Sequence, residues 1–190
     1  MPPAELLLIR HAPVLADGRL AGRRDVAAVL PDAAVLAAVR ALAGPVDRVI
    51  ASPARRCRAT AAALWPEAAL VEDARLWEQD FGAWEGLPFA DLPDLGDLAP
   101  AALAGHAPPG GESFADLCAR TAPALEAWAA LPGRSALVAH AGTVRAALAL
   151  ALGAAAPALA FRIDPLSLTR LQPCGGQGWA VGGVNLVAAC

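Results

Sequence analysis

LLLIRHAP, residues 6–13, decides the fold class, because an unbroken apolar run ends abruptly in an arginine and a histidine. Four consecutive aliphatic residues without polar alternation are typical of a strand that is buried on both faces, as in a parallel sheet. Such a strand over residues 6–9 delivers Arg10 and His11 at its carboxyl end. An Arg-His pair alone more often marks only the exit of a strand from the core, so the rest of the chain must decide.

Strand and helix patterns alternate along the remaining sequence. Further strands are predicted over residues 46–51, 68–72, 136–139, 167–172 and 179–187. Helices are predicted over residues 33–43 (after Asp32 as N-cap), 53–64, 114–131 and 143–152. This alternation predicts an α/β protein with three layers, α/β/α, in which a mostly parallel sheet carries helices on both faces.

Start and stop signals set the predicted helix bounds. Ser52-Pro53 reads as the N-cap and first residue of a helix. Ser113 with Asp116 predicts a capping box, and Pro123 predicts a kink in the helix that follows. Residues 79–111, rich in Pro, Gly and Asp, predict an irregular cap-like insertion with one short helix. The whole stretch 1–190 is expected to form a single domain around this cap.

Polar groups follow three of the predicted strands at their carboxyl ends. Arg10-His11 follows the first strand, residues 52–56 follow the second, and His140 follows the strand at 136–139. In sheets of this kind, ligands bind beyond the carboxyl ends of the strands. The sequence therefore predicts that these groups form the floor of one site.

Composition limits the partners. The chain is 57% hydrophobic with a net charge of −3, and all 15 basic residues are arginine. A mildly acidic chain does not predict nucleic-acid binding. The arginines do cluster locally, at residues 19–24 and 55–58, which suits a small anion better than a long polyanion.

Targeting and metal signals are missing from the sequence. The start MPPAE lacks a secretory pattern, and the longest apolar stretch, residues 146–152, is too short to span a bilayer. The cysteines and histidines are scattered without metal-ligand spacing. We therefore expect a cytoplasmic protein with reduced thiols, no membrane contact, no metal and no cofactor.

Five motifs in order carry a resemblance to a known family: RHAP (10–13), SPARRCRATA (52–61), WEQDFGAWEG (77–86), PPGGES (108–113) and VAHAGTVR (138–145). Together they resemble the histidine phosphatase superfamily, also called the phosphoglycerate mutase-like family, from about residue 5 to 146. The chain departs from the family pattern at four positions. Ala12 and Ala141 stand where glycine is usual, Pro13 replaces an acidic residue, and Asp17 stands where many members have asparagine.

The resemblance implies a phosphoglycerate mutase-like fold and a set of catalytic roles. His11 would be the nucleophile that forms a phosphohistidine, Glu78 the general acid, and His140 a group that binds the transferring phosphoryl. Arg10 and Arg56 would hold the phosphate dianion, since the planar guanidinium fork matches its oxygens, and would keep His11 neutral by lowering its pKa. Glu85 competes with Glu78 for the acid role.

The same resemblance implies a wider substrate-binding set and leaves some residues without a role. Substrate binding would involve Arg10, Arg56, His140, Asp17, Arg23 and Ala141. The roles of Arg145, His106 and Glu112 stay open. The expected partner is a small-molecule phosphate ester, and a homodimer is left open.

Three functions compete. The leading one is a histidine acid-type phosphatase, the second a phosphoglycerate mutase-type phosphotransferase, and the third a non-catalytic regulatory module. Residues 79–111 contain no arginine or lysine but five carboxylates, Asp80, Glu85, Asp91, Asp94 and Asp97. Such a cap is expected to repel a second anion, which favours a phosphatase whose leaving group is neutral or cationic. GRRD (22–25) with PPGGES is similar to α-ribazole phosphatases, which implies α-ribazole 5′-phosphate and cobalamin synthesis.

Overall fold

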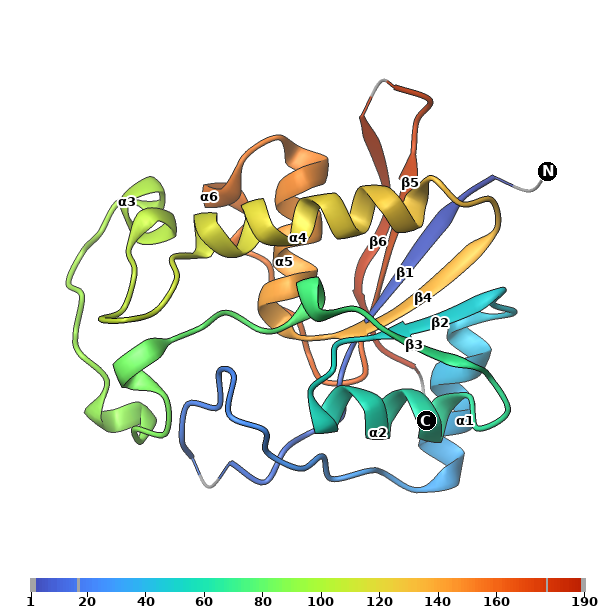
Figure 1. Ribbon diagram of the computed structural model, residues 1–190, viewed down its shortest axis with the longest axis horizontal. Coiled ribbons are helices and arrows are strands. Elements are labelled where there is room, and N and C mark those ends of the chain that lie inside the picture. The colour runs from blue at the N-terminus through green and yellow to red at the C-terminus, as the bar shows by residue number, and fades with distance from the viewer. Residues whose placement is uncertain (1–2, 17, 177, 189–190) are drawn as a thin grey trace.

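The computed structural model describes residues 3–16, 18–176 and 178–188. Its centre is a mixed six-stranded sheet in the order β3-β2-β4-β1-β5-β6 (Figure 1). The strands are β1 (Glu5–Arg10), β2 (Arg48–Ala51), β3 (Leu70–Glu72), β4 (Arg134–Ala139), β5 (Leu168–Pro173) and β6 (Trp179–Leu186). β1 to β4 pair in parallel, while β5 runs antiparallel to both β1 and β6. The predicted mostly parallel α/β sheet is confirmed.

Helices cover both faces of this sheet. They are α1 (Ala33–Ala43), α2 (Arg55–Leu64), α3 (Pro100–Gly105), α4 (Phe114–Ala129), α5 (Ala141–Leu152) and α6 (Ala155–Ala158). Figure 1 shows α1 and α2 on one side of the sheet, and α4, α5 and α6 on the other. The three predicted layers are therefore present.

The apolar run of β1 explains why two helical layers are needed. Leu6 and Leu8 pack in the cluster under α4 and α5, whereas Leu7 and Ile9 pack in the cluster under α1 and α2. Successive side chains of a strand point to opposite faces, so four apolar residues in a row require apolar cover on both. All four side chains are fully buried. Truncating any one of them to alanine is expected to cost roughly 2–5 kcal/mol of stability.

The segment between β3 and α4 contains more structure than the sequence predicts. It holds three short 3-10 helices, η1 (Ala74–Leu76), η2 (Gly82–Trp84) and η3 (Phe89–Asp91), together with α3. The capping box of Ser113 and Asp116 is confirmed, and α4 continues through Pro123. Figure 1 shows this segment extending away from the sheet beside the loop that follows β1.

The predicted start of α2 is wrong. The helix begins at Arg55 with Ala54 as its N-cap, two residues later than Ser52-Pro53 indicates. The hydroxyl of Ser52 is hydrogen-bonded to His140, with Oγ 2.9 Å from Nε2, and accepts only a longer bond, 3.4 Å, from the amide of Ala54. The residue directly after β2 therefore contacts His140 at the carboxyl ends of the strands, and the helix begins only after it. Within the described ranges, no helix is long and apolar enough to cross a membrane.

Candidate active site

A cavity of about 580 Å³ opens at the carboxyl ends of β1, β2 and β4. Four arginines line it, namely Arg10, Arg19, Arg56 and Arg145. His11 also lies on its wall, and Glu78 is the one carboxylate among the described lining residues. Leu20, Phe81, Phe89 and Leu159 supply apolar walls. None of the four arginines forms an ion pair with a described carboxylate. The cavity is therefore suited to an anion with an organic group attached.

His11 is held with one ring nitrogen ready to act as a nucleophile. Its Nδ1 lies 2.7 Å from the carbonyl oxygen of Ala12, and its Nε2 lies 3.2 Å from Nε of Arg56. Because a guanidinium only donates, Nε2 must accept, which places the ring proton on Nδ1. Burial lowers the pKa of His11 to about 3, and the Arg56 and Arg10 charges add to this against the opposing Ala12 hydrogen bond. Burial, rather than the arginine charges expected from the sequence, is thus the main cause of the lowered pKa.

Arg56 lies in the first turn of α2 and is almost fully buried. Its Nη1 donates to the carbonyl of Arg24 at 2.8 Å, and its Nη2 donates to the carbonyl of Gly22 at 2.7 Å and to Nδ1 of His140 at 3.1 Å. These bonds fix the guanidinium plane between the two histidines. The neighbouring Arg55 is exposed.

His140 lies behind Arg56 rather than on the cavity wall. It is fully buried, and its ring is stacked on Trp77 with centroids 6.3 Å apart. Nδ1 accepts from Arg56, so Nε2 carries the proton and donates to Oγ of Ser52. Burial, followed by the charge of Arg56, lowers the pKa of His140 well below its usual value. Both ring nitrogens are thus already bonded, which makes His140 the acceptor that orients Arg56.

Glu78 belongs to the cavity and is poised to carry a proton. Its Oε1 accepts from the Gln79 amide at 3.0 Å, and its Oε2 accepts from the Gly142 amide at 3.4 Å. Burial raises the pKa of Glu78, against the opposing effects of the Gln79 hydrogen bond and the Arg56 charge. A side chain at Gly142 would collide with this carboxylate and displace it, so glycine there leaves room for Glu78 beside α5. A raised carboxyl pKa is what a general acid needs near neutral pH.

Glu85, the competing acid, lies elsewhere. Its Oε1 accepts from the amides of Arg23 at 2.7 Å and Phe81 at 3.1 Å. It packs so tightly against Gly22 that a Cβ there would overlap it. Glu85 is not among the described residues that line the cavity. Its contacts are those of a group that fixes the loop after β1.

Arg10 and Arg145 share one anchoring segment. Nη1 of Arg10 donates to the carbonyl of Ile163 at 2.6 Å, and Nε of Arg145 donates to the carbonyl of Phe161 at 2.9 Å. The charge of Arg145 contributes, after burial, to lowering the pKa of Arg10. Nε of Arg10 is buried without a hydrogen-bond partner among the described residues, a donor that an anionic oxygen would satisfy. Sequence left Arg145 open, and the structure places it in the cavity.

Other predicted site residues fall differently. Ala141 lines the cavity at the start of α5. Arg23 is not among the described lining residues, because its guanidinium pairs with Asp80 and Glu112, each at 3.4 Å. Asp17 lies outside the described residues. Arg19 takes a place on the wall that the sequence had not assigned, although the arginine cluster around it was the available signal.

The premise of an acidic cap over the substrate is wrong. None of the carboxylates Asp80, Glu85, Asp91, Asp94 and Asp97 is among the described residues that line the cavity. Several bind main-chain amides of their own segment instead, such as Gly82 for Asp80 and Gly96 for Asp94. Their charge therefore gives no reason to expect a neutral or cationic leaving group.

The two remaining unassigned residues also lie off the cavity wall. His106 stacks on Trp84 with ring centroids 5.6 Å apart. Glu112 binds Arg120 and Arg23 at the base of the cap segment. Across the described ranges, no group of three or more His, Cys, Asp or Glu is placed to hold a metal ion.

The fold and the site define an α/β protein with a histidine-centred, arginine-rich anion site at its strand ends. The chain belongs to the histidine phosphatase superfamily (branch 1), whose family model matches residues 6–186. "Bifunctional protein Rv2228c" of Mycobacterium tuberculosis is 36% identical over 138 residues, which is 62% of this chain and 35% of that protein. The chain thus spans about a third of the length of that curated relative.

Two solved structures show how closely the fold is shared. A mycobacterial glucosyl-3-phosphoglycerate phosphatase is 27% identical with a TM-score of 0.83, and the match covers 97% of this chain and 100% of that one. A structure described as a putative α-ribazole-5′-P phosphatase from Escherichia coli is 21% identical with a TM-score of 0.80, covering 99% and 100%. The second likeness concerns the fold alone. The solved structures that resemble this chain therefore include phosphatases.

Proposed function

We propose that this protein is a phosphomonoesterase that hydrolyses a small phosphorylated metabolite through a phosphohistidine on His11. One observation carries the proposal: a neutral His11 with its proton on Nδ1 shares a basic cavity with a carboxyl group, Glu78, whose pKa is raised. The nucleophile, the charge-neutralising arginines and the acid are thus in one place. Residues 79–111 would act as a cap on a single domain.

The first half-reaction transfers the phosphoryl group to the protein. Arg10 and Arg56 neutralise the phosphate dianion, and a phosphate oxygen replaces Nε2 of His11 as the acceptor for Nε–H of Arg56 as the ester enters. The lone pair of His11 Nε2 forms the P–N bond while the P–O bond to the leaving group breaks. Glu78 gives its proton to that oxygen. The Ala12 carbonyl, bonded to Nδ1–H, stabilises the positive charge that develops on the ring.

The second half-reaction returns the protein to its starting state. The Glu78 carboxylate accepts a proton from a water molecule, whose oxygen forms a new bond to phosphorus. The P–N bond breaks, its electron pair returns to Nε2, and inorganic phosphate leaves. A mutase would share the first half but would return the phosphoryl group to an organic hydroxyl. Analysis of the products separates the two, because only the phosphatase releases inorganic phosphate in step with substrate loss.

The motif resemblance supports α-ribazole 5′-phosphate, and thus a role in cobalamin synthesis, as one specific substrate. The cavity favours a second candidate, a phosphate ester whose organic group carries another anion. Arg19 and Arg145 line the cavity without a described carboxylate partner, in addition to Arg10 and Arg56, which are assigned here to the phosphoryl group. Arginine forks bind carboxylates as readily as phosphates.

A panel of phosphate monoesters tests the function. Release of inorganic phosphate from α-ribazole 5′-phosphate, carboxylated esters and neutral sugar phosphates would be measured with purified protein. His11→Ala should abolish release while leaving the circular dichroism spectrum and melting temperature close to wild type. Rapid quench with ³²P-labelled substrate should trap an acid-labile protein phosphate in the wild type only. Turnover by the His11→Ala variant, or a wild type without labelled protein during turnover, would overturn the proposal.

Arg145→Met separates the two substrate candidates. If a second anion is bound there, kcat/KM should fall on carboxylated esters by roughly 10-fold or more, as for one lost charge-assisted hydrogen bond, and stay near wild type on neutral esters. An equal fall on both classes would instead place Arg145 on the phosphoryl group itself. No change on either class would exclude it from substrate binding.

A further inference from the structure

We propose that Arg120 and Glu112 are positioning residues that hold the main chain of Glu78 where its carboxyl group can protonate the leaving oxygen. Neither side chain is among the described residues that line the cavity. Both act through the segment 75–80, which carries Glu78 and also Trp77, the ring stacked on His140. The inference rests on the proposed function, since it assigns these residues to the acid step of that reaction.

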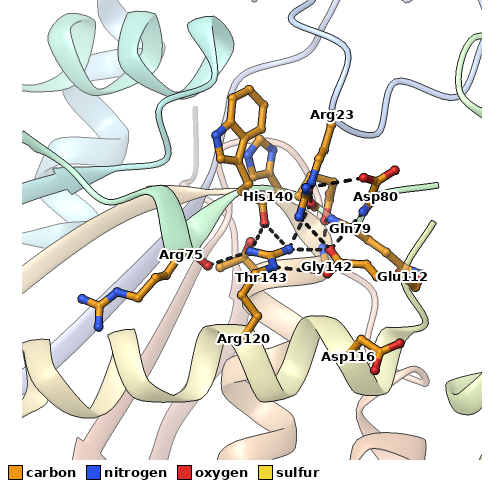
Figure 2. A network of polar contacts seen from close by, with 12 residues as sticks. Arg23, Arg75, Gln79, Asp80, Glu112, Asp116, Arg120, His140, Gly142 and Thr143 are labelled. Atoms are coloured by element: carbon orange, nitrogen blue, oxygen red, sulfur yellow. Dashed lines mark hydrogen bonds and ion pairs between the residues drawn. The ribbon is translucent and has the colours of Figure 1, made fainter. Parts of the chain in front are cut away.

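Arg120 binds three main-chain carbonyls of this segment. From the middle of α4, its Nη1 donates to the carbonyls of Arg75 at 2.8 Å and Trp77 at 3.2 Å. Its Nη2 donates to the carbonyls of Trp77 at 3.2 Å and Glu78 at 3.3 Å. Figure 2 shows the guanidinium rising from α4 into the centre of these contacts. One side chain thus fixes the path of the chain on the N-terminal side of the acid.

Glu112 fixes both Arg120 and the chain on the other side of the acid. Its Oε1 and Oε2 accept from Nη2 and Nε of Arg120 at 2.5 and 3.2 Å, a two-point ion pair. Oε1 also accepts from the Asp80 amide at 3.0 Å, and the Glu112 main chain exchanges bonds with Gln79 Nε2 and the Asp80 carbonyl, each at 2.8 Å. Figure 2 shows Glu112 between Asp80 and Arg120. The main chain is therefore held on both sides of Glu78, the proposed general acid.

Glu78 needs this support because no regular structure holds it. Residues 77–81 lie between η1 and η2 without helix or strand hydrogen bonds. The carboxyl group itself has only the amides of Gln79 and Gly142 as partners. By contrast, Arg120 stands on a 16-residue helix whose start is fixed by a capping box one residue after Glu112. The ion pair of Arg120 and Glu112 therefore fixes the loop that carries Glu78 against α4.

The loss of this pair should be specific to the proton-donation step. A small displacement of a reacting group can cost on the order of 10²-fold in rate. A general acid matters most for a poor leaving group such as an alkoxide, and little for p-nitrophenolate, which leaves largely unaided. Misplacing Glu78 should therefore lower kcat on alkyl phosphates and spare p-nitrophenyl phosphate. KM should change little, because the phosphate-binding arginines are untouched.

Arg120→Met and Glu112→Gln test the proposal in the full chain, with Glu78→Gln as the reference. We expect each to lower kcat on an alkyl phosphate by on the order of 10–100-fold, with a far smaller loss on p-nitrophenyl phosphate. Glu112→Gln keeps the length of the side chain but places an amide donor against Arg120. Arg120→Lys, which keeps the charge yet has one nitrogen for three carbonyls, should fall between Arg120→Met and wild type.

Arg134→Met is the matched control for a merely structural role. Arg134 also pairs with a carboxylate, Glu5, at 2.7 Å and donates to two main-chain carbonyls, those of Pro45 and Ala43, at 2.6 and 2.7 Å. It lies at the opposite end of β4 from His140. Its loss should lower the melting temperature about as much as loss of Arg120 and leave the ratio of alkyl to aryl activity unchanged.

The outcomes are decisive in each direction. A lower alkyl-to-aryl ratio in Arg120→Met and Glu112→Gln, with an unchanged ratio in Arg134→Met, supports the proposal. If Glu78→Gln changes the ratio but the two variants do not, the positioning role is wrong and the acid assignment survives. If Glu78→Gln itself leaves the ratio unchanged, both the acid assignment and the inference fail. An insoluble Arg120→Met leaves Glu112→Gln and Arg120→Lys to decide.

Discussion

At the scale of single residues, the arginines at positions 55–58 show that burial distinguishes residues that a motif places side by side. Arg55 and Arg56 are adjacent in sequence, yet Arg56 is buried between two histidines while Arg55 is exposed. Arg56→Ala should lower kcat/KM on the order of 10²–10³-fold, as for loss of one preorganised donor to the transition state. Arg55→Ala should stay within about 2-fold, because the exposed side chain of Arg55 does not line the cavity.

Kinetics of the two variants on one substrate check this directly. Melting temperatures measured alongside show whether the loss of the Gly22 and Arg24 carbonyl bonds destabilises the fold. A larger effect from Arg55 than from Arg56 would mean that the first turn of α2 presents a different face to the substrate.

His11 connects catalysis to stability through its depressed pKa. The folded chain holds that pKa near 3, against 6.5 for an unperturbed histidine. The unfolded state therefore binds the proton more tightly, and the free energy of unfolding falls as pH drops from about 6.5 toward 3. The share of His11 between pH 7.5 and 5 is about 2 kcal/mol.

Urea unfolding at pH 7.5 and pH 5 measures this share. His11→Gln removes it, so the variant should lose less stability than wild type across that interval. His140, whose pKa is also lowered by burial, should keep part of the loss in both proteins. Equal losses would mean that His11 titrates normally in the folded chain.

At the scale of elements, local sequence patterns predict strands and helix caps, but they do not predict contacts between residues that are far apart in the chain. The unbroken apolar run of β1 and the Ser113 capping box have local causes, so the sequence alone gives both. Ser52 has the local signature of an N-cap, but a partner 88 residues away, His140, takes its hydroxyl. The sequence shows that residues 79–111 contain five carboxylates. It does not show where these side chains point, because that depends on main-chain amides that become available only when the segment folds. Of the residues predicted at strand ends, Arg10 and His11 lie on the cavity wall after β1, whereas His140, after β4, lies behind Arg56.

Ser52→Ala measures what the tip of β2 does for the site. It removes the acceptor that lies 2.9 Å from Nε2 of His140 and leaves only the longer contact with Sγ of Cys57 at 3.5 Å, so the ring that orients Arg56 is held less firmly. A hydrogen bond of about 1 kcal/mol predicts a fall in kcat/KM of roughly 5–10-fold. Ser135→Ala is the matched control. Ser135 is a fully buried serine of β4 that accepts from Arg48 at 2.9 Å, at the end of the sheet away from the cavity.

Similar losses of activity from the two serine variants would indicate a general effect of serine removal on the sheet. A loss confined to Ser52→Ala, with comparable melting temperatures, would tie the effect to His140. The second outcome is expected, because Ser52 is hydrogen-bonded to His140, whereas Ser135 is bonded to Arg48.

At the scale of the whole molecule, the distribution of charge matters more than its sum. The chain carries a net charge of −3, yet its cavity is lined by four arginines and one carboxylate among the described residues. The other described carboxylates lie outside the cavity lining, and some of them pair with arginines, such as Asp73 with Arg75 and Glu5 with Arg134. An acidic total charge is therefore compatible with an anion-binding site, and net charge alone does not indicate the charge of the substrate.

The same distribution predicts that catalysis needs no divalent cation. In phosphoryl transfer a metal ion neutralises the phosphate oxygens, and here Arg10 and Arg56 stand where that charge is required. Mg²⁺ prefers several oxygen ligands around it, whereas Glu78 is the single carboxylate among the described cavity residues and is bonded to two amides. Activity on a chosen ester should stay within about 2-fold after EDTA treatment and desalting, and added Mg²⁺ or Zn²⁺ should not raise it further. A metal-dependent phosphatase treated in parallel confirms that chelation was complete. Strict dependence on an added cation would contradict the assignment of the charge-neutralising role to the arginines, even if His11 proved to be the phosphorylated residue.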